Sequence, residues 1–358
     1  MMDNIKKVFH AKCEADKKGK KCISVVTTPE IWEKVKPVYD LLFTKAYEIE
    51  TVLVEDPGGT YETSSERELH VQDASPELPI TDSHVSDFLR QLPSKGTVSP
   101  MVSAIVPGIF YHGFSTRSGG LSLFSSLSSL NLNFNPNRRD PRVVVQENRY
   151  RLAAACGFGV EKLYIAKAEH GSRVWVVGKD PPDAYDAIVT NSPGVTIAAL
   201  GADCIPMLFA DPVNQVVGAA HSGWRGTLAG VAAETLRAMA ENFGTVPCDV
   251  LVVLGPSIGP CCFEVGEDVA EKFAAVQPAC VVREEGKVKP TIDLRKVSRL
   301  LLEQTGVKPE NIDDGTLGTE ATVTLCTACE PEQRFFSYRR DGAQFGTQVG
   351  FIGIKGAE

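Results

Sequence analysis

The sequence predicts an α+β protein with mixed, largely antiparallel sheets and packed helices, preceded by a small N-terminal α/β module. Three observations indicate this fold class. Short apolar segments between residues 163 and 221 follow one another too closely for helical crossovers, so many must pair as antiparallel strands. A long amphipathic pattern after Gly223 indicates a helix that packs on them. Residues 22–55 alternate two apolar runs with one helical pattern, which is typical of a small α/β unit.

The chain divides into three predicted segments. Residues 1–55 form the α/β module, in which "CISVV" and "IETVLVE" flank a helical pattern that includes Trp32, Val35 and Val38. Residues 56–100 are polar and rich in Pro, Ser, Asp and Glu, so we expect a linker with one short helix at 86–92. Residues 101–358 form the predicted catalytic domain.

The catalytic domain opens with a strand and a glycine loop in "AIVPGIFYHGFSTRSGGLS". A capped helix follows, starting at Asp140 and Pro141 and ending at Gly157. After the short strands, the amphipathic helix is predicted to run without a break to Gly244. A buried strand in "VLVVLGP" and two further helices, in "GEDVAEKFAAV" and "DLRKVSRLLLEQTG", complete the pattern.

Composition excludes several classes of protein. The chain has 358 residues, of which 43% are hydrophobic and 23% charged, as in globular proteins. Its formal net charge of -8 and scattered basic residues disfavour nucleic acid as a partner. The longest apolar stretch, 195–210, is interrupted by Asp203 and predicts no membrane span. Ten cysteines without a signal peptide indicate reduced thiols and a cytoplasmic location.

A cysteine and a histidine stand at the two ends of a predicted hairpin in "GADCIPMLFADPVNQVVGAAHSGWRG". If the turn is centred between Pro212 and Val213, Cys204 lies directly opposite His221. Opposed residues of an antiparallel pair lie about 5 Å apart at Cα, so the thiol and the imidazole would share one pocket. A slip of one residue would place them on opposite faces.

His170, between a strand and a turn, is the third candidate of this site. Two histidines and one cysteine suit a zinc ion with an open fourth position for water or substrate. The alternative is that Cys204 is a small buried hydrophobe and His170 a hydrogen-bonded turn residue.

Several residues are candidates for holding an anionic substrate such as phosphate. The motif "HSGWRG" opens a predicted helix, whose first backbone amides and the guanidinium of Arg225 suit an anion. The loop "STRSGGLS" adds hydroxyls and a second guanidinium, and "FFSYRRDG" adds further arginines near the C-terminus. The candidates are Ser115, Arg117, Arg225, Gly226 and Arg339.

The remaining cysteine motifs are interpreted as structural. "CTAC" (Cys326 to Cys329) has half of a zinc-ribbon spacing but no second CxxC to match it. The vicinal Cys261 and Cys262 are expected to point to opposite sides, as neighbours on a strand do.

Three long motifs in order, "GADCIPMLFADP…VVGAAHSGWRGTLAGV", "GPSIGPCCFEV" and "FFSYRRDG", resemble the laccase-domain family, multicopper polyphenol oxidase-like by name and also described as purine nucleoside phosphorylases. The resemblance covers about residues 104–356. One departure is Gly201, where bacterial members commonly carry threonine. The N-terminal extension is similar to that of the animal members.

The resemblance implies an α-β-β sandwich and a catalytic metal centre of His170, Cys204 and His221. The implied metal is zinc, with copper as the alternative, and phosphate is the co-substrate. The implied reactions are phosphorolysis of purine nucleosides (adenosine, inosine, guanosine and methylthioadenosine) and deamination of adenosine. The implied setting is purine metabolism and innate immunity.

The residues themselves disfavour two other chemistries. A multicopper oxidase needs many histidines, typically in His-X-His pairs, whereas this chain has six histidines and none is so paired. The zinc nucleobase-deaminase signature is absent, because neither His170 nor His221 begins His-X-Glu and Leu325 precedes "CTAC". Asp203 is the nearest carboxylate to the site, although it should point away from it.

Two alternative functions stay open. Cys204 and His221 would also serve as the nucleophile and base of a metal-independent cysteine hydrolase. Alternatively, the protein acts as a scaffold that binds protein partners through residues 1–99.

Overall fold

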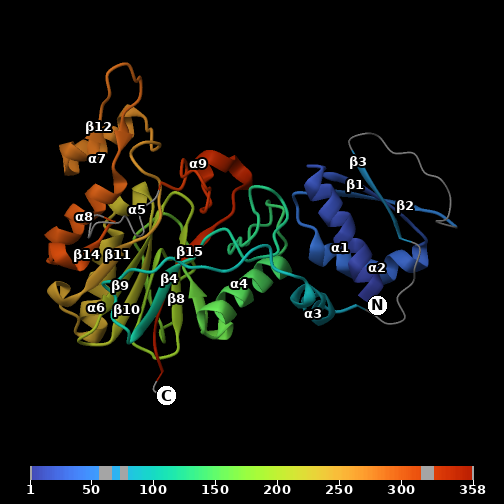
Figure 1. The fold of residues 1–358 in the computed structure, drawn as a ribbon, viewed down its shortest axis with the longest axis horizontal. Helices are drawn as coiled ribbons and strands as arrows, with labels where there is room; N and C mark the ends of the chain where they lie inside the picture. The colour runs from blue at the N-terminus through green and yellow to red at the C-terminus, as the bar shows by residue number, and fades with distance from the viewer. Residues whose placement is uncertain (1, 56–66, 73–79, 316–325, 357–358) are drawn as a thin grey trace. The chain divides into compact units, whose positions relative to one another are not determined.

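The computed structural model describes residues 2–55, 67–72, 80–315 and 326–356 (Figure 1). The chain forms two compact units. Unit 1 contains Met1–Val98, Arg117–Leu152 and Ala343–Gly346; unit 2 contains Ser99–Thr116, Ala153–Gly342 and Thr347–Glu358. The fold is α+β with mixed and antiparallel sheets, as predicted.

Unit 1 is built on a parallel three-stranded sheet with the order β2-β1-β3. Its strands are β1 (Cys22–Thr27), β2 (Glu48–Leu53) and β3 (Arg67–Gln72). It contains the helices α1 (Met2–Lys17), α2 (Pro29–Leu42) and α3 (Asp82–Gln91) and most of α4 (Arg142–Cys156). The Thr28 side chain caps α2 by accepting from the amide of Ile31, and Pro29 occupies the first turn, where its missing N–H costs no bond.

The structure groups these residues differently from the three segments expected from the sequence. Residues 56–66 and 73–79 of the predicted linker lie outside the described residues, but 80–98 belong to unit 1. Val85, Phe88 and Leu89 of α3 are buried in the same apolar core as Leu121 and Val144. The short helix expected at 86–92 is α3, which begins four residues earlier. The polar composition of 56–100 hid its attachment to the core, because only three apolar side chains at helical spacing make that attachment.

Unit 2 contains three layers: helices, a six-stranded sheet and a four-stranded sheet. The six-stranded sheet has the order β14-β11-β9-β10-β7-β6 and the four-stranded sheet the order β4-β15-β8-β5. The strands are β4 (Phe110–Phe114), β5 (Leu163–Ile165), β6 (Val174–Val176), β7 (Ala187–Thr190), β8 (Thr196–Gly201), β9 (Ile205–Asp211), β10 (Val216–Ser222), β11 (Leu251–Leu254), β14 (Ile312–Asp313) and β15 (Gln348–Ile354).

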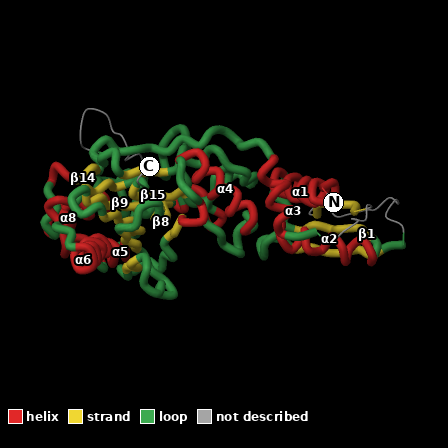
Figure 2. Tube along the Cα trace, turned by 90° about the horizontal axis from the view of Figure 1, so that it is seen from below, coloured by secondary structure: helices red, strands yellow, loops and turns green. Residues whose placement is uncertain are grey.

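The helices of the described chain beyond α3 are α4 (Arg142–Cys156), α5 (Trp224–Leu228), α6 (Val231–Phe243), α7 (Glu267–Val276), α8 (Leu294–Gln304) and α9 (Tyr338–Asp341). A small two-stranded sheet pairs β12 (Val281–Val282) with β13 (Thr291–Ile292). Short 3₁₀ turns occupy Val160–Lys162, Pro247–Asp249, Pro278–Cys280, Pro309–Asn311 and Gly342–Gln344. Figure 2 shows α6 and α8 beside the strands that they cover.

Alternation along the strands divides the core of unit 2 into two layers. Met207 and Phe209 of β9 pack with the helices, whereas Leu208 of β9 and Val217 of β10 pack toward the four-stranded sheet. Successive strand residues point to opposite faces, so nearly continuous apolar runs are needed where both faces are buried.

The predicted long helix after Gly223 is two helices. Ala229 and Gly230 separate α5 from α6, and Gly230 has φ +79°, a left-handed conformation that favours glycine. The predicted end at Gly244 is confirmed, because this residue caps α6 in the left-handed conformation.

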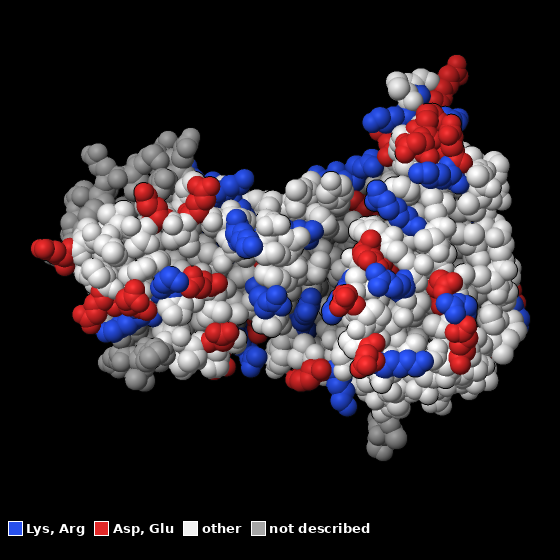
Figure 3. Space-filling model, turned by 180° about the vertical axis from the view of Figure 1, so that it is seen from behind, with Lys and Arg blue, Asp and Glu red and all other residues white. Residues whose placement is uncertain are grey.

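The surface carries both signs of charge. On the face shown in Figure 3, acidic and basic side chains are interspersed rather than gathered into one basic patch. Ion pairs such as Arg283 with Glu267 account for part of this mixing. None of the helices in the described part of the chain combines the length and apolar content that crossing a membrane requires.

Candidate active site

The β9–β10 hairpin brings Cys204 and His221 to the same side, with a register two residues away from the predicted one. His221 lies opposite Pro206 rather than Cys204, because the turn spans residues 212–215. The Asp211 carboxylate accepts hydrogen bonds from the amides of Val213 and Asn214, which fixes the turn at this position. A shift of two residues preserves the face of each side chain, so the predicted convergence survives the error in register.

Cys204 precedes β9 in a tight turn. Asp203 has φ +88°, a conformation that is uncommon for a residue with a side chain. Its carboxylate accepts hydrogen bonds from the Thr327 hydroxyl (2.7 Å) and the Arg339 amide (2.7 Å). These bonds hold the turn and join the Asp203 carboxylate to residues outside the cluster of His170, Cys204 and His221.

His170 lies in the loop between β5 and β6, with φ +64°. The amides of Glu169, His170 and Gly171 all donate to the carboxylate of Asp186, at 3.2, 3.0 and 2.8 Å. The loop is therefore folded around one buried carboxylate, which holds His170 in its left-handed conformation.

The three predicted residues meet in one place. The ligand atoms of His170, Cys204 and His221 lie within 4.8 Å of one another, and Cys204 Sγ is 4.0 Å from His170 Nε2. Gly223 gives the cluster its space, because an added Cβ there would lie 2.9 Å from Cys204 Sγ and 3.0 Å from His170 Cδ2.

Asp186 is the functional candidate that sequence reasoning missed. It is fully buried just before β7, and it accepts a hydrogen bond from His221 Nδ1 at 2.8 Å as well as the three loop amides. In the sequence, Asp186 is recognisable only as an acid before the strand in "DAIVT". Its hydrogen-bond partners lie 15 to 35 residues away along the chain. Fixing Nδ1 leaves Nε2 of His221 as the nitrogen free to bind a ligand.

Electrostatics couple the three side chains. Burial by itself would raise the pKa of the Cys204 thiol, but His221 and His170 outweigh it and lower the pKa to about 6. Burial would likewise lower the pKa of His221, but Cys204 and Asp186 raise it to about 9. Burial opposes the ionisation of Asp186 too, yet His221 and the loop amides hold its pKa below the usual value.

The donor set fits one transition-metal ion. Two imidazole nitrogens and one thiolate are ligands that zinc binds in three-residue sites. The Asp186–His221 bond is the carboxylate–histidine arrangement that orients such ligands. Copper would accept the same atoms, and the described residues bring no other histidine into the cluster.

The candidates for phosphate binding lie in different settings. Ser115 is fully buried, and its hydroxyl accepts from the amide of Val349. Arg117, in unit 1, donates to the carbonyls of Ser125 and Ser128. Arg339 donates to the carbonyls of Cys262 and Glu264. These contacts give all three a role in holding loops.

Arg225 and Gly226 lie on the short helix that follows His221. Arg225 is exposed and stacks on the Trp224 ring at 4.4 Å. Gly226 is buried, and a Cβ there would lie 3.0 Å from the carbonyl oxygen of Gly171, so it allows α5 to approach the His170 loop. Arg225 is thus an exposed arginine on α5, the helix that begins three residues after His221.

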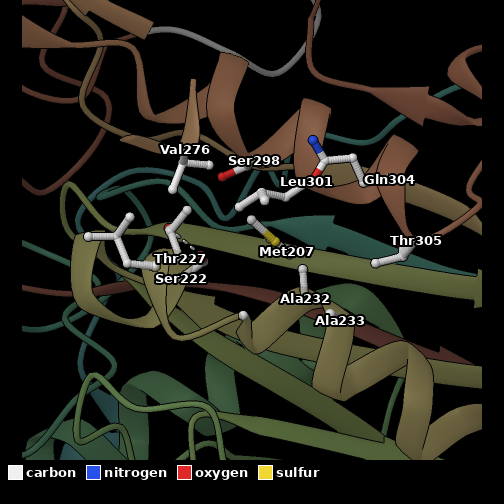
Figure 4. Close-up of a pocket in the computed structure, with 12 residues that line it drawn as sticks. Met207, Ser222, Thr227, Ala232, Ala233, Val276, Ser298, Leu301, Gln304 and Thr305 are labelled. Carbon is white, nitrogen blue, oxygen red and sulfur yellow. Dashed lines mark hydrogen bonds between the residues drawn. The ribbon is translucent and has the colours of Figure 1, made fainter. Parts of the chain in front are cut away.

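A mainly apolar cavity of about 220 Å³ lies between β9, α6 and α8 (Figure 4). Its polar groups include the hydroxyls of Ser222 and Thr227, which bond to each other at 2.8 Å. Met207 and Ser222 line it, so by alternation it lies on the helix side of β9 and β10, whereas His221 points to the opposite side. None of the three clustered residues lines this cavity.

A second cluster contradicts the expectation for the vicinal cysteines. Cys261 and Cys262 lie in a turn, not on a strand, and their sulfurs converge with those of Cys326 and Cys329 within 4.8 Å. Neighbouring side chains point to opposite sides only on a strand. Cys261 and Cys262 lie in a turn that begins at Pro260, so the expectation does not apply to them. The CxxC motif of Cys326 and Cys329 is therefore matched by the vicinal pair Cys261 and Cys262 rather than by a second CxxC motif.

Comparison with known proteins gives matches over most of the chain. Residues 111–355 match the family model described as multi-copper polyphenol oxidoreductase laccase. The chain is 46% identical over 351 residues to "Purine nucleoside phosphorylase LACC1" of Homo sapiens, covering 97% of this chain and 80% of the relative. It is 39% identical over 246 residues to "Purine nucleoside phosphorylase" of Deinococcus radiodurans, covering 68% of this chain and 88% of the relative.

Solved structures match the same region. The crystal structure of YlmD from Geobacillus stearothermophilus has a TM-score of 0.61 and 31% identity, covering 71% of this chain and 94% of its own. The structure of the hypothetical protein YfiH from Bacillus licheniformis has a TM-score of 0.60 and 30% identity, covering 69% and 93%.

Proposed function

Because the chain belongs to the family described as multi-copper polyphenol oxidoreductase laccases, in which the relatives above are named purine nucleoside phosphorylases, we propose that it is a purine nucleoside phosphorylase. The observation that carries the proposal is the convergence of His170, Cys204 and His221 around the buried Asp186. The reaction is nucleoside plus phosphate giving free base plus ribose 1-phosphate. The protein would act in cytoplasmic purine metabolism.

We propose that His170, Cys204 and His221 hold a zinc ion. Zinc supplies Lewis-acid chemistry, which polarises a bound oxygen and makes a water molecule more acidic. The residues themselves provide the rest: Asp186 keeps the proton of His221 on Nδ1, and the Asp186-bound loop fixes the direction of His170. Gly223 keeps the space between them open.

In the proposed phosphorolysis, a phosphate oxygen forms a bond to ribose C1 as the bond from C1 to the purine nitrogen breaks. The purine leaves with the bonding electron pair and takes a proton, and the sugar passes through an oxocarbenium-like state. Arg225 is proposed to hold the phosphate, because it is an exposed arginine on the helix turn that follows His221. Gly226 would let that turn lie close to the His170 loop.

Arg339, Arg117 and Ser115 enter the proposal in supporting roles. Arg339 donates to two loop carbonyls and its amide donates to Asp203, so it would position the Cys204 turn. Arg117 would organise the glycine loop, and Ser115 would hold the start of β15.

Deamination of adenosine to inosine and ammonia is the second proposed reaction. It consumes one water molecule and needs no phosphate. The expected substrates for phosphorolysis are adenosine, inosine, guanosine and methylthioadenosine.

The test is an incubation of purified protein of known metal content with adenosine, with and without phosphate. Chromatography should resolve adenine that depends on phosphate, and inosine that does not. Cys204→Ala should abolish both products while far-UV circular dichroism stays unchanged. Full activity of this variant would remove the assignment of the site, and absence of both products from folded, zinc-loaded protein would remove the purine assignment.

One observation favours a second candidate function. The lowered pKa of Cys204 and the raised pKa of His221 are those of a thiolate–imidazolium pair, the form used by cysteine hydrolases. Activity that needs no metal and disappears on treatment with iodoacetamide would favour this candidate. Activity that disappears on chelation and returns with zinc would favour the phosphorylase.

A further inference from the structure

Four cysteines from two separate turns converge in unit 2, and none of them belongs to the proposed active site. The sulfurs of Cys261, Cys262, Cys326 and Cys329 all lie within 4.8 Å of one another, and all four are free thiols. We propose that these four cysteines bind a structural zinc ion, distinct from the ion at His170, Cys204 and His221.

The distances suit four thiolates around one ion. Zinc–sulfur bonds of about 2.3 Å in a tetrahedron place each pair of sulfurs about 3.8 Å apart. Cys261 Sγ and Cys329 Sγ are 3.5 Å apart, and no pair of the four exceeds 4.8 Å. Paired disulfides would need only two close contacts, whereas here all six pairs are close.

The backbone is shaped around the sulfurs. The amide of Gly259 donates to Cys326 Sγ at 3.3 Å, and the amide of Thr327 donates to the carbonyl of Ser257 at 3.1 Å. Each turn is therefore fastened to the other independently of the metal, and an amide–sulfur bond favours the thiolate that zinc binds. A CxxC turn supplying two ligands is the usual half of such a site.

Arg295 and Arg339 lie near the proposed site, where positive charge would offset that of the thiolates. Zinc with four thiolates carries two negative charges, and its formation releases one proton from each thiol that ionises. A Cβ on Gly259 would lie 3.0 Å from Arg295 Nη2 and 3.2 Å from Cys261 Sγ, so these two groups flank the same point. The Arg339 guanidinium donates to the carbonyl of Cys262.

The proposed role is structural. Four protein ligands leave no position for substrate, in contrast to the three-residue site. Thr327, between the ligands Cys326 and Cys329, donates to the Asp203 carboxylate, and Asp203 precedes Cys204. The proposed zinc site therefore braces the turn that positions Cys204.

The first test compares zinc content by mass spectrometry of untagged protein. Cys261→Ser combined with Cys329→Ser should contain one zinc fewer per chain than the wild type. The control combines Cys156→Ser with Cys248→Ser, two cysteines outside both clusters, and should keep the wild-type content. An unchanged zinc content in the first variant would overturn the proposal.

A second test uses the wild-type chain, so it does not depend on a variant that folds. Cys261 and Cys329 are exposed, and burial therefore cannot protect them from alkylation. We expect iodoacetamide to label them much more slowly in the zinc-loaded protein than after chelation, with Cys22 as the reference thiol. Equal labelling rates, or a peptide map that joins any of the four in a disulfide in the isolated protein, would overturn the proposal.

Discussion

At the scale of single residues, Asp186 has the largest number of roles in the proposed active site. Its two oxygens accept three loop amides and the Nδ1–H of His221, and the side chain is fully buried. The same carboxylate thus sets the backbone of one proposed ligand and the ring orientation of another. Replacing it should affect both histidines together.

We predict that Asp186→Asn lowers the zinc affinity of the chain by roughly 10- to 100-fold, the usual effect of losing such a partner. The introduced NH₂ group would face the amides of Glu169 and Gly171, donor against donor, at the position of Oδ2. Competition with a chromophoric chelator measures the affinity. Asp183→Asn, an exposed acid in the same loop, is the matched control, and equal affinities of the two variants would contradict the prediction.

Gly223 provides a second prediction at this scale. Its φ of -79° and ψ of 172° are open to any residue, so Gly223→Ala adds no backbone strain. The added methyl would lie 2.9 Å from Cys204 Sγ and 3.0 Å from His170 Cδ2, which pushes the two proposed ligands apart. We expect a lower zinc content with an unchanged circular dichroism spectrum. Gly108→Ala, where the methyl meets no atom within 4 Å, should behave as the wild type.

At the scale of elements, a histidine joins β4 to the segment before it. His112 on β4 accepts a hydrogen bond from the Ser103 amide through Nε2, at 2.9 Å, and the Ser103 hydroxyl bonds to Asp313 on β14. Burial lowers the pKa of His112, against a smaller opposing effect of the Asp313 carboxylate. The native state therefore prefers the neutral imidazole.

This preference predicts a pH dependence of stability. Below the unfolded pKa of about 6.5, the unfolded chain binds a proton at this position more readily than the folded chain. The contribution of His112 to the free energy of unfolding should therefore be highest above pH 6.5. It should fall as the pH decreases toward the lowered native pKa of this residue. Urea titrations from pH 7.5 to 5 of the wild type and of His112→Gln measure this. The variant should show a shallower decline, and parallel curves would contradict the assignment.

The β9–β10 hairpin shows why the predicted register was wrong by two residues. Asp211 fixes a turn whose centre lies one residue further along the chain than predicted, and Gln215 takes φ +52° to return the chain into β10. The sequence carried this signal, because Asp-Pro-Val-Asn is typical of a turn in which the aspartate accepts backbone amides. The helix break at Gly230 was similarly readable as a glycine within a helical pattern.

At the scale of the whole molecule, unit 1 combines segments that are far apart in sequence. Leu121, Val143 and Val144 belong to the same apolar core as Ile23, Val35 and Leu89. Residues 1–99 are therefore not a removable appendage of a domain that begins at residue 101. This shared core matters for the alternative that the protein acts as a scaffold through residues 1–99.

We predict that a chain lacking residues 1–99 exposes Leu121, Val143 and Val144 and aggregates or loses thermal stability. Burying each such side chain contributes about 1.5 to 3 kcal/mol, so three together are a large share of a domain's stability. Light scattering and a thermal melt measure the outcome. A Lys6→Ala, Lys34→Ala chain, changed only at the exposed surface of unit 1, is the control. A monomeric truncated chain with wild-type melting temperature would contradict this prediction.

The sequence by itself determined the fold class and the identity of the three residues that converge in the proposed active site. Strand spacing, helix ends and hydrophobic periodicity are local properties, and a hairpin relates residues only 17 positions apart, so local reasoning reached Cys204 and His221. Even an error of two residues in register left both on one face.

Only the tertiary structure decided what surrounds these residues. Asp186 meets His170 and His221 through contacts between different strands and loops, and Cys261 and Cys262 meet Cys326 and Cys329 across more than 60 residues. Ser115, an expected anion ligand, is likewise buried by a contact with a segment far away in sequence, the strand β15. A side chain's neighbours depend on which distant segments pack together, and that packing follows from the burial of the whole core rather than from any local pattern.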